Sequence, residues 1–170
     1  MNKNSTTDLF FAQTGLDKTR VQQLVEQSLH GLDDGELYLE FNQSESMSFD
    51  DGRLKNASFN TAQGFGLRGV LGESSGYAHS CELSEAAMKR AAQTVRAVNY
   101  GQDVIERVTG PPVGSNQALY MSDNPLEKQG FAEKVALLEQ IDTYLRAKDP
   151  RVKQVTASLS GVWQAVQIIR

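Results

Sequence analysis

The chain has 170 residues and a formal net charge of −4, from 17 lysine and arginine residues against 21 aspartate and glutamate residues. Its hydrophobic fraction of 39% and its modest charge exclude an intrinsically disordered chain and predict a single globular domain over residues 1–170. One cysteine excludes a scaffold held by internal disulfides, and no apolar run reaches the roughly 18 residues that a membrane span needs.

The same composition bears on compartment and partners. A slightly acidic chain argues against direct binding of nucleic acid, for which a basic face is expected. The polar residues 1–8 carry no apolar signal segment, so the sequence predicts a cytoplasmic protein that does not enter a membrane.

The first 33 residues carry helix signals. A short apolar run, Leu9–Ala12, stops at Gly15. Asp17 is a plausible N-cap for a helix that ends at Gly31. One face of this helix is formed by Val21, Leu24, Val25, Ser28 and Leu29.

From Gly35 the hydrophobic period changes to two, which predicts strands. Asp50–Gly52 is a turn signal and separates the first strand from the second. The predicted strands of this antiparallel meander are residues 37–49, 53–62, 64–71 and 77–81.

Two more helices are predicted after the meander. Ser84 is a good N-cap for the first, whose apolar face is Met88, Ala91, Ala92, Val95 and Val98. Residues 100–123 lose periodicity and predict a loop. Asn124 and Pro125 open the second helix, which should end near Asp149. Its predicted apolar face is Val135, Leu138, Ile141 and Leu145.

The final segment predicts two strands, 152–159 and 162–170, joined across Ser160–Gly161. The predicted fold is therefore α+β, with a twisted antiparallel sheet of about five or six strands and three main helices packed on it. Because the last strand is apolar and no polar tail follows it, we expect the chain to be a fragment or half of an assembly.

One segment of the third strand, Gly64–Gly69, spells the G-x-G-x-x-G pattern of dinucleotide-binding folds. That motif requires a tight turn from a strand into a helix, so that phosphate can lie at the N-terminus of the helix. Here Val70 and Leu71 continue the strand, so we interpret the glycines as relieving a curved or bulged strand.

Candidate chemical groups are few. His79 and Cys81 would share one face of a strand, but zinc needs three or four ligands and the other histidine, His30, lies on a distant helix. Arg68 lies in an apolar strand, where it needs an ion-pair partner or an exposed face. Neither H-E-x-x-H, H-E-x-x-x-H nor a P-loop occurs. The sequence therefore predicts no catalytic, cofactor-binding or metal-binding residue in this chain.

The ordered series of strand, turn, glycine-rich strand, helix and tail resembles the opening domain of the TldD/PmbA family. The segments that carry the resemblance are Leu37–Phe41, Phe49–Lys55, Gln63–Arg68, Gly76–Ala78 and Asp149–Trp163. The tail, together with Tyr120 and Asn124–Leu126, looks closer to the TldD branch than to the PmbA branch. The residues that match the family pattern, as a structural signature only, are Gly64, Gly66, Arg68 and Gly76.

The resemblance implies a cytoplasmic zinc metallopeptidase system for proteolysis and peptide maturation. In such a system a TldD-like subunit pairs with a PmbA-like subunit, and unfolded peptides reach a metal site inside the assembly. The zinc site belongs to a later domain of the TldD chain, with an H-E-x-x-x-H motif and a further cysteine, and is absent from residues 1–170. The resemblance therefore predicts an N-terminal domain that is inactive alone and holds no cofactor.

Two other functions stay open at this point. The chain could be a non-enzymatic protein-interaction module that pairs with a PmbA-like partner. It could also be a regulator of DNA gyrase, as an older description of the family suggests, and the acidic balance implies that such an effect passes through protein contact.

Overall fold

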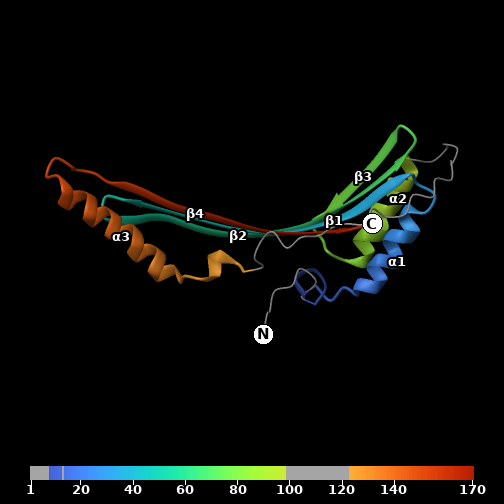
Figure 1. The fold of residues 1–170 in the computed structure, drawn as a ribbon, viewed down its shortest axis with the longest axis horizontal. Helices are drawn as coiled ribbons and strands as arrows, with labels where there is room; N and C mark the ends of the chain where they lie inside the picture. The colour runs from blue at the N-terminus through green and yellow to red at the C-terminus, as the bar shows by residue number, and fades with distance from the viewer. Residues whose placement is uncertain (1–7, 13, 99–122) are drawn as a thin grey trace. The chain divides into compact units, whose positions relative to one another are not determined.

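A computed structural model describes residues 8–12, 14–98 and 123–170 of the chain. The elements, in chain order, are η1 (Asp8–Ala12), α1 (Lys18–Leu29), β1 (Asp34–Asp50), β2 (Arg53–Leu71), β3 (Ser74–Ser80), α2 (Glu85–Val98), η2 (Pro125–Glu127), α3 (Phe131–Lys148) and β4 (Thr156–Ile169). The strands form one antiparallel sheet in the order β3-β2-β1-β4 (Figure 1). The predicted α+β class with three main helices is confirmed.

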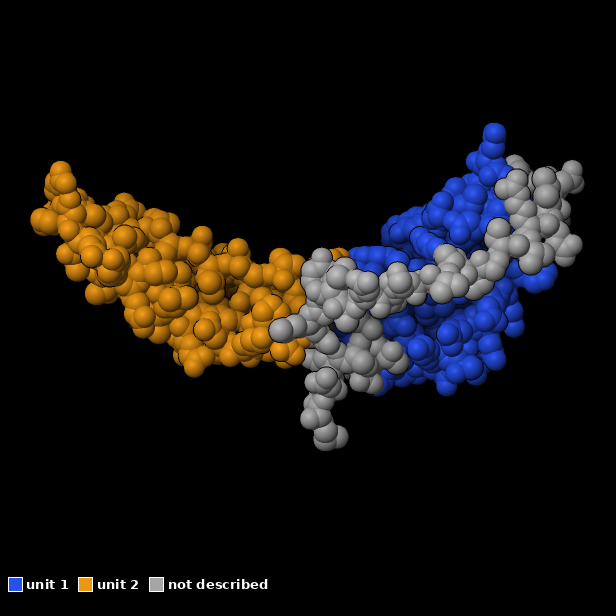
Figure 2. All heavy atoms as spheres, in the orientation of Figure 1, with its two compact units in different colours: residues 1–41, 62–122, 165–170 blue, residues 42–61, 123–164 orange. Residues whose placement is uncertain are grey.

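The chain divides into two compact units (Figure 2). Unit 1 comprises residues 1–41, 62–122 and 165–170, and unit 2 comprises residues 42–61 and 123–164. Helices α1 and α2 belong to unit 1 and α3 belongs to unit 2, whereas β1, β2 and β4 each contribute residues to both. None of the helices in the described part of the chain is long and apolar enough to cross a membrane.

The predicted number of strands is wrong, because two predicted breaks do not occur. Strand β2 continues through Gly64 and β4 continues through Ser160–Gly161, which leaves four strands among the described residues. Neither Gly64 nor Gly161 has a positive φ, as a glycine-driven turn would require. A Cβ at Gly161 would lie 2.5 Å from Cδ2 of Leu126, so this glycine permits close packing of η2 instead of a turn.

The turn and the first two helix starts follow the sequence signals. Asp17 accepts a hydrogen bond from the backbone N of Arg20 at 2.8 Å, and Ser84 Oγ accepts one from the backbone N of Ala87 at 3.1 Å. Asp51 and Gly52, between β1 and β2, have φ values of 50° and 74°, which fit a type I′ hairpin turn. These local predictions are confirmed.

Unit 1 has a core between its helices and one face of the sheet. The fully buried side chains in this unit are Phe10, Val21, Val25, Leu37, Leu39, Leu67, Met88 and Val95. Helix α2 packs against β3, and α1 packs against α2 (Figure 1). The predicted apolar face of α2 is buried at Met88, Ala91, Ala92 and Val95, whereas the side chain of Val98 lies outside the described part. A Cβ at Gly69 would lie 2.7 Å from Cγ1 of Val95, so this glycine lets α2 approach β2 closely.

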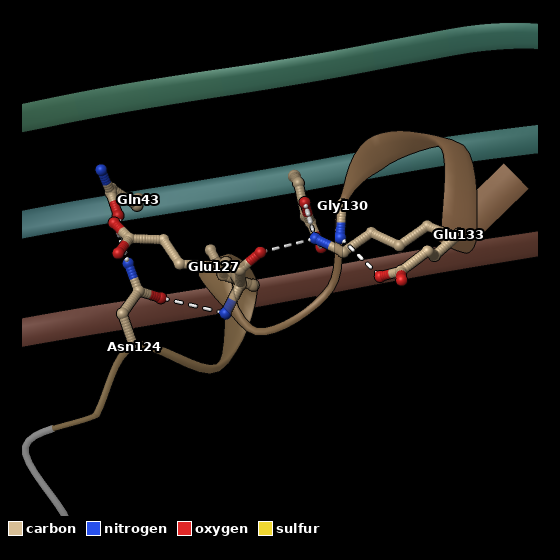
Figure 3. A network of polar contacts seen from close by, with 8 residues as sticks. Gln43, Asn124, Glu127, Gly130 and Glu133 are labelled. Atoms are coloured by element: carbon tan, nitrogen blue, oxygen red, sulfur yellow. Dashed lines mark hydrogen bonds and ion pairs between the residues drawn. The ribbon is translucent and has the colours of Figure 1, made fainter.

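The start of the third helix differs from the prediction. Asn124 caps only the short 3-10 helix η2: its Oδ1 accepts from Leu126 N at 3.0 Å, and its Nδ2 donates to Gln43 Oε1 at 2.6 Å (Figure 3). Helix α3 begins at Phe131, where Gly130 N donates to Glu133 Oε2 at 2.9 Å. The predicted end near Asp149 is confirmed, and the predicted loop over residues 100–123 lies, except for Asp123, outside the described residues.

The predicted apolar face of α3 is also partly wrong. Leu138 is buried against Met47 and Phe49 in the core of unit 2, but Ile141 and Leu145 are 37% and 41% exposed. The residues buried on the same face as Leu138 are Lys134 and Asp142. Both are ion-paired, Lys134 with Glu45 and Asp142 with Arg146, so paired charges occupy buried positions that lie outside the predicted apolar face.

Candidate functional site

A groove of about 260 Å³ lies on the outer face of the sheet in unit 1. Side chains alternate across a strand, so Leu37 and Leu39 of β1 face the core while Tyr38 and Glu40 face the groove. The remaining lining residues are Ala62, Gln63, Gly64, Phe65 and Gly66 of β2, and Tyr77, His79, Ser80 and Cys81 of β3 and its end.

Two glycines of β2, Gly64 and Gly66, lie under close neighbours in this groove. A Cβ at Gly64 would lie 2.8 Å from the carbonyl oxygen of Ser80, and a Cβ at Gly66 would lie 2.6 Å from Oη of Tyr77. Any side chain at these positions would therefore collide with β3 or displace Tyr77. Close approach therefore accounts for these two glycines. The register from Phe65 to Leu71 is unbroken, so no bulge occurs there, and the expected curvature stays a prediction.

The wall on β1 is a hydrogen-bonded pair of side chains. Oη of Tyr38 donates to Oε2 of Glu40 at 3.0 Å. Burial, and then this hydrogen bond, raise the pKa of the Tyr38 phenol above its ordinary value. The phenol therefore stays protonated at neutral pH and acts as a donor to the carboxylate.

The wall on β3 is aromatic. The rings of Tyr77 and His79 stack with their centroids 5.7 Å apart and their planes at 29°. In the antiparallel register His79 lies opposite Gly66, and Tyr77 lies opposite Arg68. The Tyr77 side chain is 60% exposed, so one surface of the stacked pair is available from solvent.

The structure brings two of the four signature residues to this groove. Gly64 and Gly66 line it. Arg68 does not line it. Its Nη1 pairs with Oδ2 of Asp34 at 3.3 Å and its side chain is 43% exposed, so both the ion pair and the exposed face named as alternatives occur. Gly76 is buried on β3 opposite Gly69.

The sequence analysis missed Tyr38, Glu40 and Tyr77 as groove residues. Their signal is the spacing of two residues along β1 and along β3, on the same side of the sheet as the glycines of β2. That signal becomes readable only once the strand register is known.

The histidines and the cysteine do not form a metal site. His79 and Cys81 both line the groove, whereas His30 is the C-cap residue of α1. Within residues 8–12, 14–98 and 123–170, no group of three histidine, cysteine, aspartate or glutamate residues could hold a metal ion. The described residues therefore do not fit a zinc centre, for which at least three protein ligands are needed. That this chain carries no catalytic or metal-binding residue stays a prediction.

A second hollow, of about 390 Å³, lies in unit 2 and includes Phe59, Phe131 and Lys134. Nζ of Lys134 donates to both carboxylate oxygens of Glu45 at 2.7 Å and to the carbonyl oxygen of Leu126 at 2.6 Å. These contacts use the ammonium donors, so Lys134 holds η2 and β1 together and has no donor left for a ligand.

The sequence matches two family models. Residues 35–98 match PmbA/TldA metallopeptidase domain 1, and residues 124–170 match the PmbA/TldA metallopeptidase central domain. The chain is 34% identical over 143 residues to a metalloprotease TldD homolog of Haemophilus influenzae, covering 84% of this chain and 30% of that protein. A TldD homolog of Buchnera aphidicola (subsp. Schizaphis graminum) is 30% identical over 82% of this chain and 29% of its own length. The chain thus spans about a third of the length of these relatives.

Solved structures share the fold. A proposed modulator of DNA gyrase from Bacteroides thetaiotaomicron matches with a TM-score of 0.63 and 14% identity, over 88% of this chain and 36% of that chain. TldE from Thermococcus kodakarensis matches with a TM-score of 0.56 and 17% identity, over 87% of this chain and 34% of that chain. Taken together with the sequence matches, these similarities show that the chain belongs to the PmbA/TldD metallopeptidase family.

Proposed function

We propose that this chain is the N-terminal domain of a TldD-like zinc metallopeptidase subunit that acts on unfolded peptides in the cytoplasm. The observation that carries the proposal is the identity of 34% with a metalloprotease TldD homolog across most of the chain. We further propose that residues 1–170 act as one domain, since three of the four described strands belong to both compact units.

In this proposal the chain is not catalytic by itself. The metal that a metalloprotease needs would be held by residues outside this segment, because the described residues contain no suitable cluster of ligands. This domain would instead contribute walls to the substrate chamber and part of the contact between subunits.

Peptide recognition would use the edges of the sheet. In the described sheet β3 and β4 are the outer strands, and an extended peptide can pair with such an edge through its backbone without sequence preference. A titration with an unfolded peptide should shift the backbone amide signals of an edge strand in an NMR spectrum. If these amides do not move at saturating peptide, the edge-pairing role is wrong.

The partner in this proposal is a PmbA-like subunit. The shared fold with TldE supports a heteromeric assembly of two related chains. A non-enzymatic module that only pairs with such a partner is the alternative, and a second alternative is regulation of DNA gyrase by protein contact, which the fold of the proposed gyrase modulator favours. Pull-downs with purified gyrase and with a PmbA-like protein separate these two alternatives.

The activity of the chain is tested by metal analysis and a peptidase assay. We expect the purified 170-residue protein to carry no stoichiometric zinc and to leave an unfolded, fluorogenic peptide uncleaved. The H. influenzae relative at full length, assayed with its partner subunit, is the matched positive control. Stoichiometric zinc together with turnover by the 170-residue protein would overturn the assignment of the chain as non-catalytic.

A further inference from the structure

We propose that an exposed face of helix α3 docks, in antiparallel orientation, onto the same face of α3 in a second copy of this chain. This face, the outer stripe, consists of Glu133, Leu137, Ile141, Tyr144 and Lys148. The proposal goes beyond the proposed function, which pairs the chain with a different, PmbA-like subunit, and it does not depend on that function.

The side chains of α3 are distributed in an unusual way. Its charged residues Lys134 and Asp142 are buried. Its large apolar residues Leu137, Ile141 and Tyr144 are exposed. Burial of a charge costs free energy even when the charge is paired, and an apolar side chain that stays in water gains little from folding. Several large apolar side chains on one exposed face mark a contact with a further surface.

The spacing of the outer stripe fits a helix as the covering element. Its residues are separated by four, four, three and four positions, which keeps them on one side of a helix. Steps of three and four residues between apolar positions are typical of helices that pack along their length against another helix. The stripe runs over most of the 18 residues of α3, so a helix of similar length fits this face.

The charges at the two ends of the stripe indicate that the partner is a second copy. Glu133 lies in the first turn of α3, and Lys148 is its last residue. In an antiparallel pair of α3 helices, the Glu133 end of each copy comes beside the Lys148 end of the other. A parallel pair would place like charges together, and the helix dipoles also favour the antiparallel orientation. Such a contact is symmetric, because the same residues are used by both copies.

Both charged residues can make this contact without losing their contacts within one chain. Glu133 uses Oε2 to accept from Gly130 N at 2.9 Å (Figure 3), and a carboxylate can accept further hydrogen bonds. Nζ of Lys148 lies 4.7 Å from the centre of the Tyr144 ring, and its ammonium group has three donors, some of which point away from the ring. A second copy therefore adds to the existing contacts and does not replace them.

The first test is the oligomeric state of the purified chain, measured by sedimentation velocity over a range of concentrations. We expect a reversible equilibrium between one and two copies of the 18.7 kDa chain. Ile141→Glu, which places a charge in the middle of the stripe, should weaken dimerisation by more than about tenfold. Val162→Glu is the matched control, because it adds the same charge at an exposed apolar residue of β4 in the same unit, and it should leave the dimer unchanged.

Two outcomes of this test would overturn the proposal. One is a chain that stays monomeric at every concentration. The other is a dimer that Val162→Glu weakens as much as Ile141→Glu does, because the sheet would then form the contact. Circular dichroism checks that both variants keep their helices.

An exchange of charges tests the antiparallel orientation and does not rely on Ile141→Glu. Glu133→Lys brings positive ends together in its own dimer, and Lys148→Glu brings negative ends together. Each variant alone should therefore dimerise about tenfold more weakly than the wild type. In an equal mixture of the two variants the facing ends again have opposite charges, so a dimer with one copy of each should form with close to the wild-type affinity.

Native mass spectrometry distinguishes the mixed dimer from the two homodimers when one variant is labelled with a heavy isotope. We expect the mixed dimer to dominate. If mixed dimers are no more abundant than random pairing of the two variants gives, the antiparallel docking of α3 is wrong.

Discussion

At the scale of single residues, Lys134 and Glu45 form an ion pair whose side chains are 7% and 9% exposed. Removal of one partner leaves the other charge buried without compensation. We expect Lys134→Met to lower the free energy of unfolding by about 3–5 kcal/mol, because the Glu45 carboxylate stays behind. Urea unfolding followed by circular dichroism measures this change.

Two further variants test the reason for that effect. Lys128 is exposed and lies 3.5 Å from Asp123, so Lys128→Met should change the free energy of unfolding by less than about 1 kcal/mol. The double variant Lys134→Met with Glu45→Met removes both charges and should recover most of the lost stability. A double variant no more stable than Lys134→Met would show that the stranded charge is not the cause.

We expect Asp50, at the end of β1, to make the stability of unit 2 depend on pH. Its carboxylate accepts hydrogen bonds from Gln154 Nε2 at 3.0 Å and Thr156 Oγ1 at 2.9 Å, and these lower the pKa of Asp50 below its ordinary value. A lowered pKa contributes stability above the pKa of the unfolded chain, about 3.9, and this contribution is lost as the pH falls through the lower, folded value.

The wild type should therefore be more stable than Asp50→Asn by a constant amount above about pH 5, and the difference should shrink below about pH 4. Urea midpoints of both proteins at pH 7, 5 and 3 measure this difference. A difference that stays constant down to pH 3 would mean that the Asp50 carboxylate does not cause the pH dependence.

What the sequence reveals at this scale depends on distance along the chain. The caps Asp17 and Ser84 were predictable because each bonds a backbone N–H three residues ahead. The pairing of Lys134 with Glu45 was not, because it joins residues 89 positions apart. The groove was missed for the same reason, since Tyr38, Gly66 and Tyr77 meet only through the pairing of three strands.

At the scale of elements, α3 shows how a helix can bury a face that its apolar pattern does not predict. Leu138 is 1% exposed and packs on Met47 and Phe49, whereas Leu145, on the predicted apolar face, is 41% exposed. We expect Leu138→Ala to lower the free energy of unfolding by about 2–5 kcal/mol. The matched variant Leu145→Ala should lower it by less than about 1 kcal/mol, because less apolar area leaves water there on folding.

Chemical denaturation of the two leucine variants distinguishes the observed face from the predicted one. If Leu145→Ala is destabilised as much as Leu138→Ala, the apolar pattern of the sequence describes the helix better than the structure does. The strand count has a related origin: Gly161 was interpreted as a turn because its packing partner, Leu126, is 35 positions away.

At the scale of the whole molecule, the chain has two compact units but a shared sheet. Three strands contribute residues to both units, so neither unit holds a complete sheet of its own. Unfolding of one unit would leave the ladder hydrogen bonds at the ends of the other without their continuation. Because the strands are shared, we expect the two units to unfold together in a single cooperative transition, although their helices are separate.

The chain offers one natural probe in each unit, because Trp163 is its only tryptophan and Cys81 its only cysteine. Tryptophan fluorescence reports on unit 2, and a fluorophore attached to the exposed Cys81 reports on unit 1.

For one folding domain we expect the two urea midpoints to coincide. Both midpoints should also shift together in Leu138→Ala of unit 2 and in Met88→Ala of unit 1. If Leu138→Ala instead shifts only the Trp163 midpoint, and Met88→Ala only the Cys81 midpoint, the units fold independently and residues 1–170 are not one domain. The folding units would then differ from the two family domains, because residues 42–61 of the first-domain match belong to unit 2 and residues 165–170 of the central-domain match belong to unit 1.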